Sequence, residues 1–155
     1  MGRRFLIRCG LMVALGIVVY AGLWAYAIAT KTNGEQKLAA LAAEAGSRGG
    51  QVFRTTLEGK PLAFLLEKCT VYMLDVTDAE IKRREVLSTS FYFFLDSCSK
   101  QTIEQQGEHV RVHLYARAIG AGGGNTTGGD FRSKDGLTWE KLDGASWIPV
   151  EGARR

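Results

Sequence analysis

The sequence contains few of the residues and motifs on which enzymes and metalloproteins depend. It has two histidines, His109 and His113, and three cysteines among 155 residues, and it has no Cys-x-x-Cys pair. A Gly-x-Ser-x-Gly nucleophile elbow is also missing. The sequence therefore predicts no catalytic residues, no cofactor and no metal site, and it favours a protein that is not an enzyme.

The concentrated positive charge that nucleic-acid binding requires is missing as well. The chain has 20 Lys and Arg against 16 Asp and Glu, but Arg3, Arg4 and Arg8 all precede its first apolar run. Removing those three from the 20 leaves 17 basic against 16 acidic residues, a net charge of +1. This balance argues against a nucleic-acid partner.

What the chain does contain is one long uncharged apolar run, from Cys9 to Ala29. As a helix its 21 residues would span about 31 Å, the thickness of the hydrocarbon core of a bilayer. The arginines before it predict, by the positive-inside bias, a cytoplasmic N-terminus. We therefore expect a single-pass protein of the bacterial inner membrane, with residues 9–29 in the lipid bilayer and its C-terminal domain in the periplasm.

A cleaved secretory signal is the alternative interpretation of the same run. Two triplets, Ala25-Tyr26-Ala27 and Ala27-Ile28-Ala29, have the small residues expected before a cleavage site. However, signal peptides have apolar regions of up to about 15 residues, and aromatic residues such as Trp24 are enriched where spanning helices meet the headgroups. The length favours a retained anchor and leaves cleavage open.

The chain divides into a basic N-terminus and anchor (1–29), an amphipathic helix with a Gly-rich linker (30–50), and an extracytoplasmic domain (51–155). The amphipathic helix is predicted over Glu35–Ala45, because its apolar residues recur at helical spacing and face the domain or a partner helix. The anchor helix is expected to end at residues 31–34. The predicted fold class is α+β, with a small, mainly antiparallel β-sheet domain after the two helices.

Alternation and β-forming residues predict strands within the domain. The predicted strands are Gln51–Leu57, Thr70–Val76, Val86–Leu95, as a central strand, and His109–Ala118, as a half-solvated antiparallel strand. Residues 61–68 are compatible with a short helix or a buried strand. Thr77 and Glu80 have the spacing of a capping box, which predicts a charged helix reaching Arg84 or Glu85.

Residues 120–129 include six glycines, a composition that predicts a loop without a packed core. The lysine and the following helix of a phosphate-binding loop are missing from this stretch, so phosphate binding is not predicted. Further on, Asp143-Gly144 predicts a turn before an edge strand at Trp147–Val150.

Between these segments, Ser133–Trp139 resembles the Asp-box turn of sialidase-like β-propellers. It is one residue shorter than the usual spacing and occurs once, and the chain is too short for a propeller. The resemblance implies a hairpin turn in which the Asp135 side chain fixes the turn backbone while Trp139 packs below it.

Two sets of site residues follow from the sequence. Cys69 and Cys98 are expected to form a disulfide, because both lie in the exported part of the chain, although two buried free thiols are the alternative. The second set occupies one face of the predicted strand 109–118 and consists of His109, Arg111, His113, Tyr115 and Arg117. This stripe could contact an anionic partner or lipid headgroups, or it could be an ordinary solvated face.

Together these features predict a single-pass membrane-anchored periplasmic accessory or assembly protein that acts by binding another envelope protein. The alternative is a cleaved, secreted small domain that binds or hydrolyses an envelope polymer, with Tyr115, Trp139 and Trp147 as stacking surfaces.

Overall fold

The computed structural model describes Tyr20, Trp24, Tyr26 and residues 33–77, 80–89, 96–120 and 123–150. Most of the predicted anchor therefore lies outside the described residues. Of the two predicted cleavage sites, only Tyr26 is described. Within the part of the chain that is described, no helix has both the length and the apolar character needed to cross a membrane.

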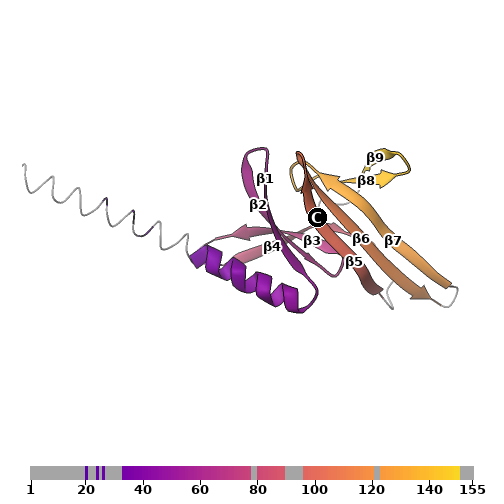
Figure 1. The fold of residues 1–155 in the computed structure, drawn as a ribbon, viewed down its shortest axis with the longest axis horizontal. Coiled ribbons are helices and arrows are strands. Elements are labelled where there is room, and N and C mark those ends of the chain that lie inside the picture. Colours follow the sequence, from indigo (N-terminus) through magenta and orange to yellow (C-terminus); the bar gives the residue numbers. More distant parts are fainter. Residues whose placement is uncertain are drawn as a thin grey trace, which may run out of the picture.

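The described domain has three layers: one helix, a four-stranded sheet and a five-stranded sheet (Figure 1). The helix covers residues 33–47. The first sheet comprises β1 (Gln51–Leu57), β2 (Lys60–Glu67), β3 (Thr70–Val76) and β4 (Ile81–Ser88). The second comprises β5 (Asp96–Gln106), β6 (His109–Gly120), β7 (Gly123–Ser133), β8 (Glu140–Asp143) and β9 (Ser146–Pro149). In each sheet the strands pair antiparallel in sequence order, which confirms the prediction of a small, mainly antiparallel domain with one short helix.

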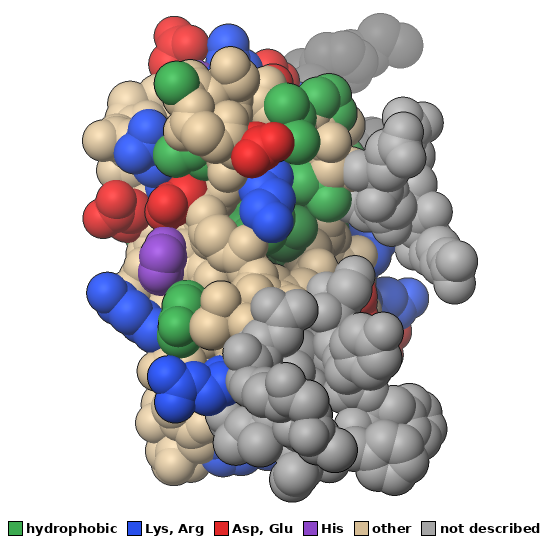
Figure 2. Space-filling model, turned by 90° about the vertical axis from the view of Figure 1, so that its right-hand side faces the viewer, with side chains coloured by type: hydrophobic (Ala, Val, Ile, Leu, Met, Phe, Trp, Pro, Cys, Tyr) green, Lys and Arg blue, Asp and Glu red, His purple; other side chains and the backbone are tan. Residues whose placement is uncertain are grey.

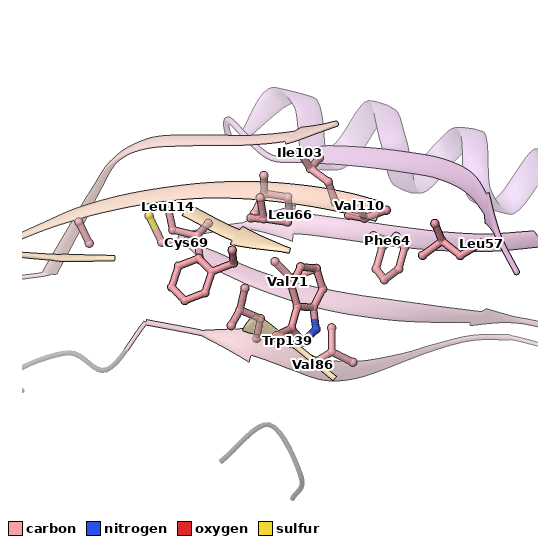
Figure 3. Packing of buried hydrophobic residues seen from close by; sticks show 14 residues of the cluster. Leu57, Phe64, Leu66, Cys69, Val71, Val86, Ile103, Val110, Leu114 and Trp139 are labelled. Atoms are coloured by element: carbon pink, nitrogen blue, oxygen red, sulfur yellow. The ribbon is translucent and has the colours of Figure 1, made fainter. Parts of the chain in front are cut away.

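The main core lies between the two sheets. Successive side chains of a strand point to opposite faces, so Phe64 and Leu66 of β2 face the second sheet while Leu65 between them faces the helix. The second sheet contributes Val110 and Leu114 of β6, both fully buried. Figure 3 shows these side chains meeting between the layers.

The helix is amphipathic as predicted, and it packs on the first sheet. Leu38, Leu41 and Ala45 are at most 7% exposed and form a second cluster with Leu65 and Leu74. The anchor helix was expected to end at residues 31–34. Of these, only residues 33 and 34 are described, and both are already helical, so the expected break is wrong there. The described helix ends after residue 47, within the Gly-rich linker, and Gly49 has a φ of 74°, which suits the left-handed closing conformation.

Two segments for which a helix was considered are strands of the first sheet. Residues 60–67 form β2, and the helix predicted after Thr77 is instead β4. The capping-box residues do bond to each other, but across a turn: the Thr77 hydroxyl donates to the Glu80 carbonyl oxygen (2.8 Å) and accepts from the Glu80 N–H (3.2 Å). The pairing of β4 with β3 overrides the local helix signal, because β4 pairs from Ile81 to Ser88 and buries Val86 and Leu87 in the main core.

The central strand predicted over Val86–Leu95 is also corrected. Its first residues belong to β4, which ends at Ser88 and, among the described strands, pairs only with β3 at the edge of the sheet. Residues 90–95 lie outside the described part of the chain. Period-two alternation therefore identified a strand here but not its position in the sheet.

The loop predicted for residues 120–129 is wrong, because residues 123–133 form β7 and pair with β6 along its length. The reason is visible at Gly128, where a Cβ atom would lie 2.1 Å from the carbonyl oxygen of Leu114 and where φ is 116°. Glycine at this position allows a close backbone approach.

The structure of residues 133–149 agrees with the sequence-based predictions for this part of the chain. The Asp135 carboxylate accepts hydrogen bonds from the N–H groups of Leu137 and Thr138 (2.8 Å each), and Trp139 is 2% exposed. The Asp-box resemblance therefore correctly implied a side-chain-fixed turn between β7 and β8. The second turn and the edge strand β9 are also confirmed.

Candidate functional site on the outer face of the five-stranded sheet

The predicted stripe lies on the outer face of β6, which pairs with β5 on one side and β7 on the other in the five-stranded sheet. Val110, Val112 and Leu114 are at most 1% exposed and face the first sheet. The residues that alternate with them point the other way and are partly or fully exposed: His109, Arg111, His113, Tyr115 and Arg117. Burial of one face thus places all five predicted residues on the opposite face.

Strand register adds neighbours that the sequence did not predict. Arg111 lies between Glu104 of β5 and Arg132 of β7, and His113 lies opposite Asp130 of β7. Arg132 and Asp130 were missed because they follow a segment that was assigned to a loop. Only the short alternation around Phe131 could have indicated a strand there.

One His–Asp hydrogen bond, one ion pair and two cation–π contacts organise this face. The Nδ1 atom of His113 lies 3.0 Å from an Asp130 carboxylate oxygen, and the Arg132 Nε–H donates to Glu140 over 2.6 Å. The guanidinium groups of Arg132 and Arg111 lie 4.4 and 5.3 Å from the ring centroid of Trp147. The two arginines are direct cross-strand neighbours, yet of the pair only Arg132 has a carboxylate partner among the described residues.

The face therefore combines charges of both signs with aromatic surface. Figure 2 views the molecule from the right-hand side of Figure 1 and shows acidic and basic side chains interspersed around a histidine. Guanidinium, imidazole and indole groups on a half-exposed strand are suited to binding by hydrogen bonds and stacking. Among the described residues, no group of three or more His, Cys, Asp and Glu side chains could hold a metal ion.

Of the three aromatic residues proposed as stacking surfaces, one is in the core. Trp139 is 2% exposed and lies close to Val71 and Val86 between the sheets (Figure 3). The prediction for Trp139 is wrong because the turn before it directs the indole inward. Tyr115 and Trp147 are half-buried, and both belong to the outer face.

The predicted disulfide is present between Cys69 and Cys98, whose Cα atoms are 5.4 Å apart. It joins the β2–β3 turn to β5, and so connects the two sheets covalently. Gln101 reinforces this junction: its side-chain oxygen accepts from the Cys69 N–H (2.8 Å) and its side-chain NH₂ donates to the Gly49 carbonyl oxygen (2.7 Å). Gln101 was not predicted, because a lone glutamine in a strand carries no sequence signal.

The Asp135 turn supports the same sheet from one end. Burial alone would raise the pKa of Asp135, but hydrogen bonds from Thr138, Leu137 and Ser133 hold this pKa below its ordinary value of 3.8. Its charged form is therefore the form that stabilises the turn.

A groove of about 730 Å³ lies at the start of the described helix, against the first sheet. Leu38, Leu74 and Val76 contribute apolar surface, and Glu35 and Arg54 contribute charge. None of the predicted site residues lines this groove, so it is separate from the outer face of the second sheet.

Comparisons with protein-family models, with curated proteins and with solved structures find no match for this chain. Functional inference therefore depends on the residues and geometry described above.

Proposed function

We propose that this chain is a single-pass protein of the bacterial inner membrane whose periplasmic domain binds another envelope protein. The binding surface is the outer face of the five-stranded sheet. The observation that carries this proposal is that the helix covers the outer face of the first sheet, whereas no described element covers the outer face of the second. That face displays Arg111, Tyr115 and Trp147, and arginine, tyrosine and tryptophan are the residues enriched at interface hot spots.

The cellular location is supported by two separate features. A disulfide between Cys69 and Cys98 is favoured in an oxidising compartment such as the periplasm. The uncharged run from Cys9 to Ala29 has the length of a membrane anchor. Within it, Tyr20, Trp24 and Tyr26 are helical and between 64% and 71% exposed. Trp24 and Tyr26 lie near the C-terminal end of the run, where aromatic residues of spanning helices are enriched at the headgroups.

A protein partner explains the outer face better than an envelope polymer does. Sugar polymers bind mainly by stacking on open aromatic rings, and two arginines already lie over the ring of Trp147. The His113–Asp130 and Arg132–Glu140 pairs instead provide the interspersed charges with which a protein surface can form complementary contacts.

Site-specific photo-crosslinking in cells tests the binding surface. A photoreactive amino acid at Tyr115 in the full chain is expected to trap a defined protein, because this side chain lies on the outer face of β6. The matched control is the same amino acid at Ala40, an exposed position on the helix, which is expected to trap none. Recovery of no protein from position 115, or of the same proteins from both positions, would reject the proposed surface.

The intact mass of the native protein, after thiol alkylation without reduction, tests the anchor. A full-length mass with one alkylated thiol is expected, because Cys9 is the only cysteine outside the disulfide. A shorter mass beginning at Ile28 or Thr30, with no alkylated thiol, would instead establish a secreted domain.

A further inference from the structure

The outer edge of β7 is covered by β8 along only part of its length. β8 pairs only with Phe131 and Arg132 of β7, whereas β6 pairs with β7 from Gly123 to Ser133. Residues 123–130 therefore have a strand on one side and, among the described residues, none on the other. In Figure 1, β7 runs along the outer margin of the sheet, and β8 and β9 lie beside one end of it.

The middle of this edge, before Asp130, lacks the features that usually prevent edge-to-edge pairing. Its sequence from Asn125 to Gly129 is Asn-Thr-Thr-Gly-Gly, with no lysine, no proline and no charge. Residues of an antiparallel strand alternate in the side to which their backbone groups point, so half of the N–H and C=O groups here point away from β6. An extended strand is the occupant that can pair with such a row of groups.

A second observation marks the middle of this edge. The hydroxyl oxygen of Thr127 is shielded from solvent and has no hydrogen-bond partner among the described residues, which is a costly arrangement for a buried polar group. Thr127 is central in the free stretch 124–130. A strand laid along the edge would bring a side chain directly opposite it.

We propose that the free edge of β7 pairs antiparallel with the same edge of a second copy of this chain, about a twofold axis at Thr127. The two Thr127 side chains then lie opposite each other, and threonine pairs are favourable across antiparallel strands. Asp130 lies opposite residue 124 of the second copy, which is glycine, so no like charges meet.

The expected dimer is weak in dilute solution. Stable complexes bury roughly 1,200–2,000 Å², and a pair of seven-residue strands provides only part of this area. Covalent trapping is therefore a better test than a measurement of molecular size in solution, because it captures a transient dimer.

The experiment uses the full-length chain in mild detergent with Cys9→Ser. The two cysteines that remain, Cys69 and Cys98, are joined in the native disulfide, so an introduced cysteine is the only free thiol. Thr127→Cys in this background is expected to form an interchain disulfide under mild oxidation, giving a species of twice 17.0 kDa. The matched control is Thr102→Cys, an exposed residue of β5 on the far side of β6, which is expected to stay monomeric.

A second substitution tests the pairing itself. The N–H of Thr126 points away from β6, because Gly120 and Gly123 close the β6–β7 connection and the pattern alternates from there. Adding Thr126→Pro to Thr127→Cys therefore preserves the β6–β7 ladder and is expected to lower the crosslinked fraction at least tenfold.

Two results would overturn the proposal: a folded Thr127→Cys variant that stays monomeric, or an equal fraction of crosslinked dimer from Thr102→Cys. If thermal melting shows that Thr127→Cys does not fold, Thr126→Cys with a short thiol-specific crosslinker gives the same test, since residue 126 is exposed.

Discussion

The two sheets differ in how many of their faces are covered, and their sequences differ accordingly. β2 lies between the helix and the second sheet and is apolar at five consecutive positions, Leu62–Leu66. β6 is covered on one face only, and it alternates strictly between apolar and polar residues. The comparison shows that a continuous apolar run in an antiparallel sheet indicates two covering layers, and that strict alternation indicates one.

The same difference determines where function can reside. Side chains on both faces of β2 are needed for packing, so substitutions there should affect stability. The outer face of β6 has no packing role against another described layer, so substitutions there should affect binding with little cost to folding.

The largest effect is expected from the layer between the sheets. Phe64→Ala should destabilise the protein by about 3–5 kcal/mol, because this ring is fully buried and its removal leaves a cavity. Urea unfolding followed by circular dichroism measures this change. A loss below about 1 kcal/mol, no larger than that of an ordinary surface substitution, would show that the two sheets do not share a core.

The disulfide that connects the two sheets is expected to have the next largest effect. Replacing Cys69 and Cys98 together by alanine should cost about 3–4 kcal/mol, because the bridge closes a loop of 29 residues in the unfolded chain. Thermal unfolding with and without reductant measures this cost. The control Cys9→Ala should not alter stability, and reductant should have no effect on the double variant.

Gly128 tests whether the glycine-rich part of β7 is a strand or a loop. Gly128→Ala should cost about 2–4 kcal/mol, since φ is positive and the new Cβ would meet the backbone of Leu114. Gly49→Ala is the matched control: φ is also positive, but nothing lies within 4 Å of the added atom. Equal effects at the two positions would favour a loop at residue 128.

Asp135 tests the turn that ends β7. Asp135→Ala should cost about 1–2 kcal/mol near neutral pH, because two backbone N–H groups lose their acceptor. The pKa of Asp135 is lowered on folding, so its stabilisation is complete above the ordinary value of 3.8 and is lost as the pH falls through the lower folded value. Urea unfolding at several pH values should show the free energies of unfolding of the native protein and of Asp135→Ala becoming equal in acid. A constant difference would contradict this assignment.

The smallest effect on stability is expected from substitutions on the outer face of the five-stranded sheet. Arg117→Ala should change the unfolding free energy by no more than about 0.5 kcal/mol, because the side chain is exposed. Crosslinking from position 115 in this variant measures its effect on binding. A large loss of stability would show that another layer covers this face.

Much of the fold could be predicted from local patterns. The bounds of β1 and β3 agree with the prediction, since turns flank each strand and β-forming residues fill it. Errors occurred where a local signal competed with sheet pairing, as at Thr77 and in the glycine-rich part of β7. The stripe on β6 was placed on one face correctly, whereas its role in binding remains a prediction.

The sequence by itself determined the uncharged N-terminal run, the amphipathic helix, the alternation of β6 and the turn at Asp135, because each depends on residues that are close in the chain. The tertiary structure alone decided that β2 is a strand, that glycines form β7, and that Arg132, Asp130 and Trp147 lie beside the predicted stripe. The physical reason is that strand pairing and side-chain contact join residues distant in the chain, and no local pattern encodes which distant strand will satisfy a given backbone.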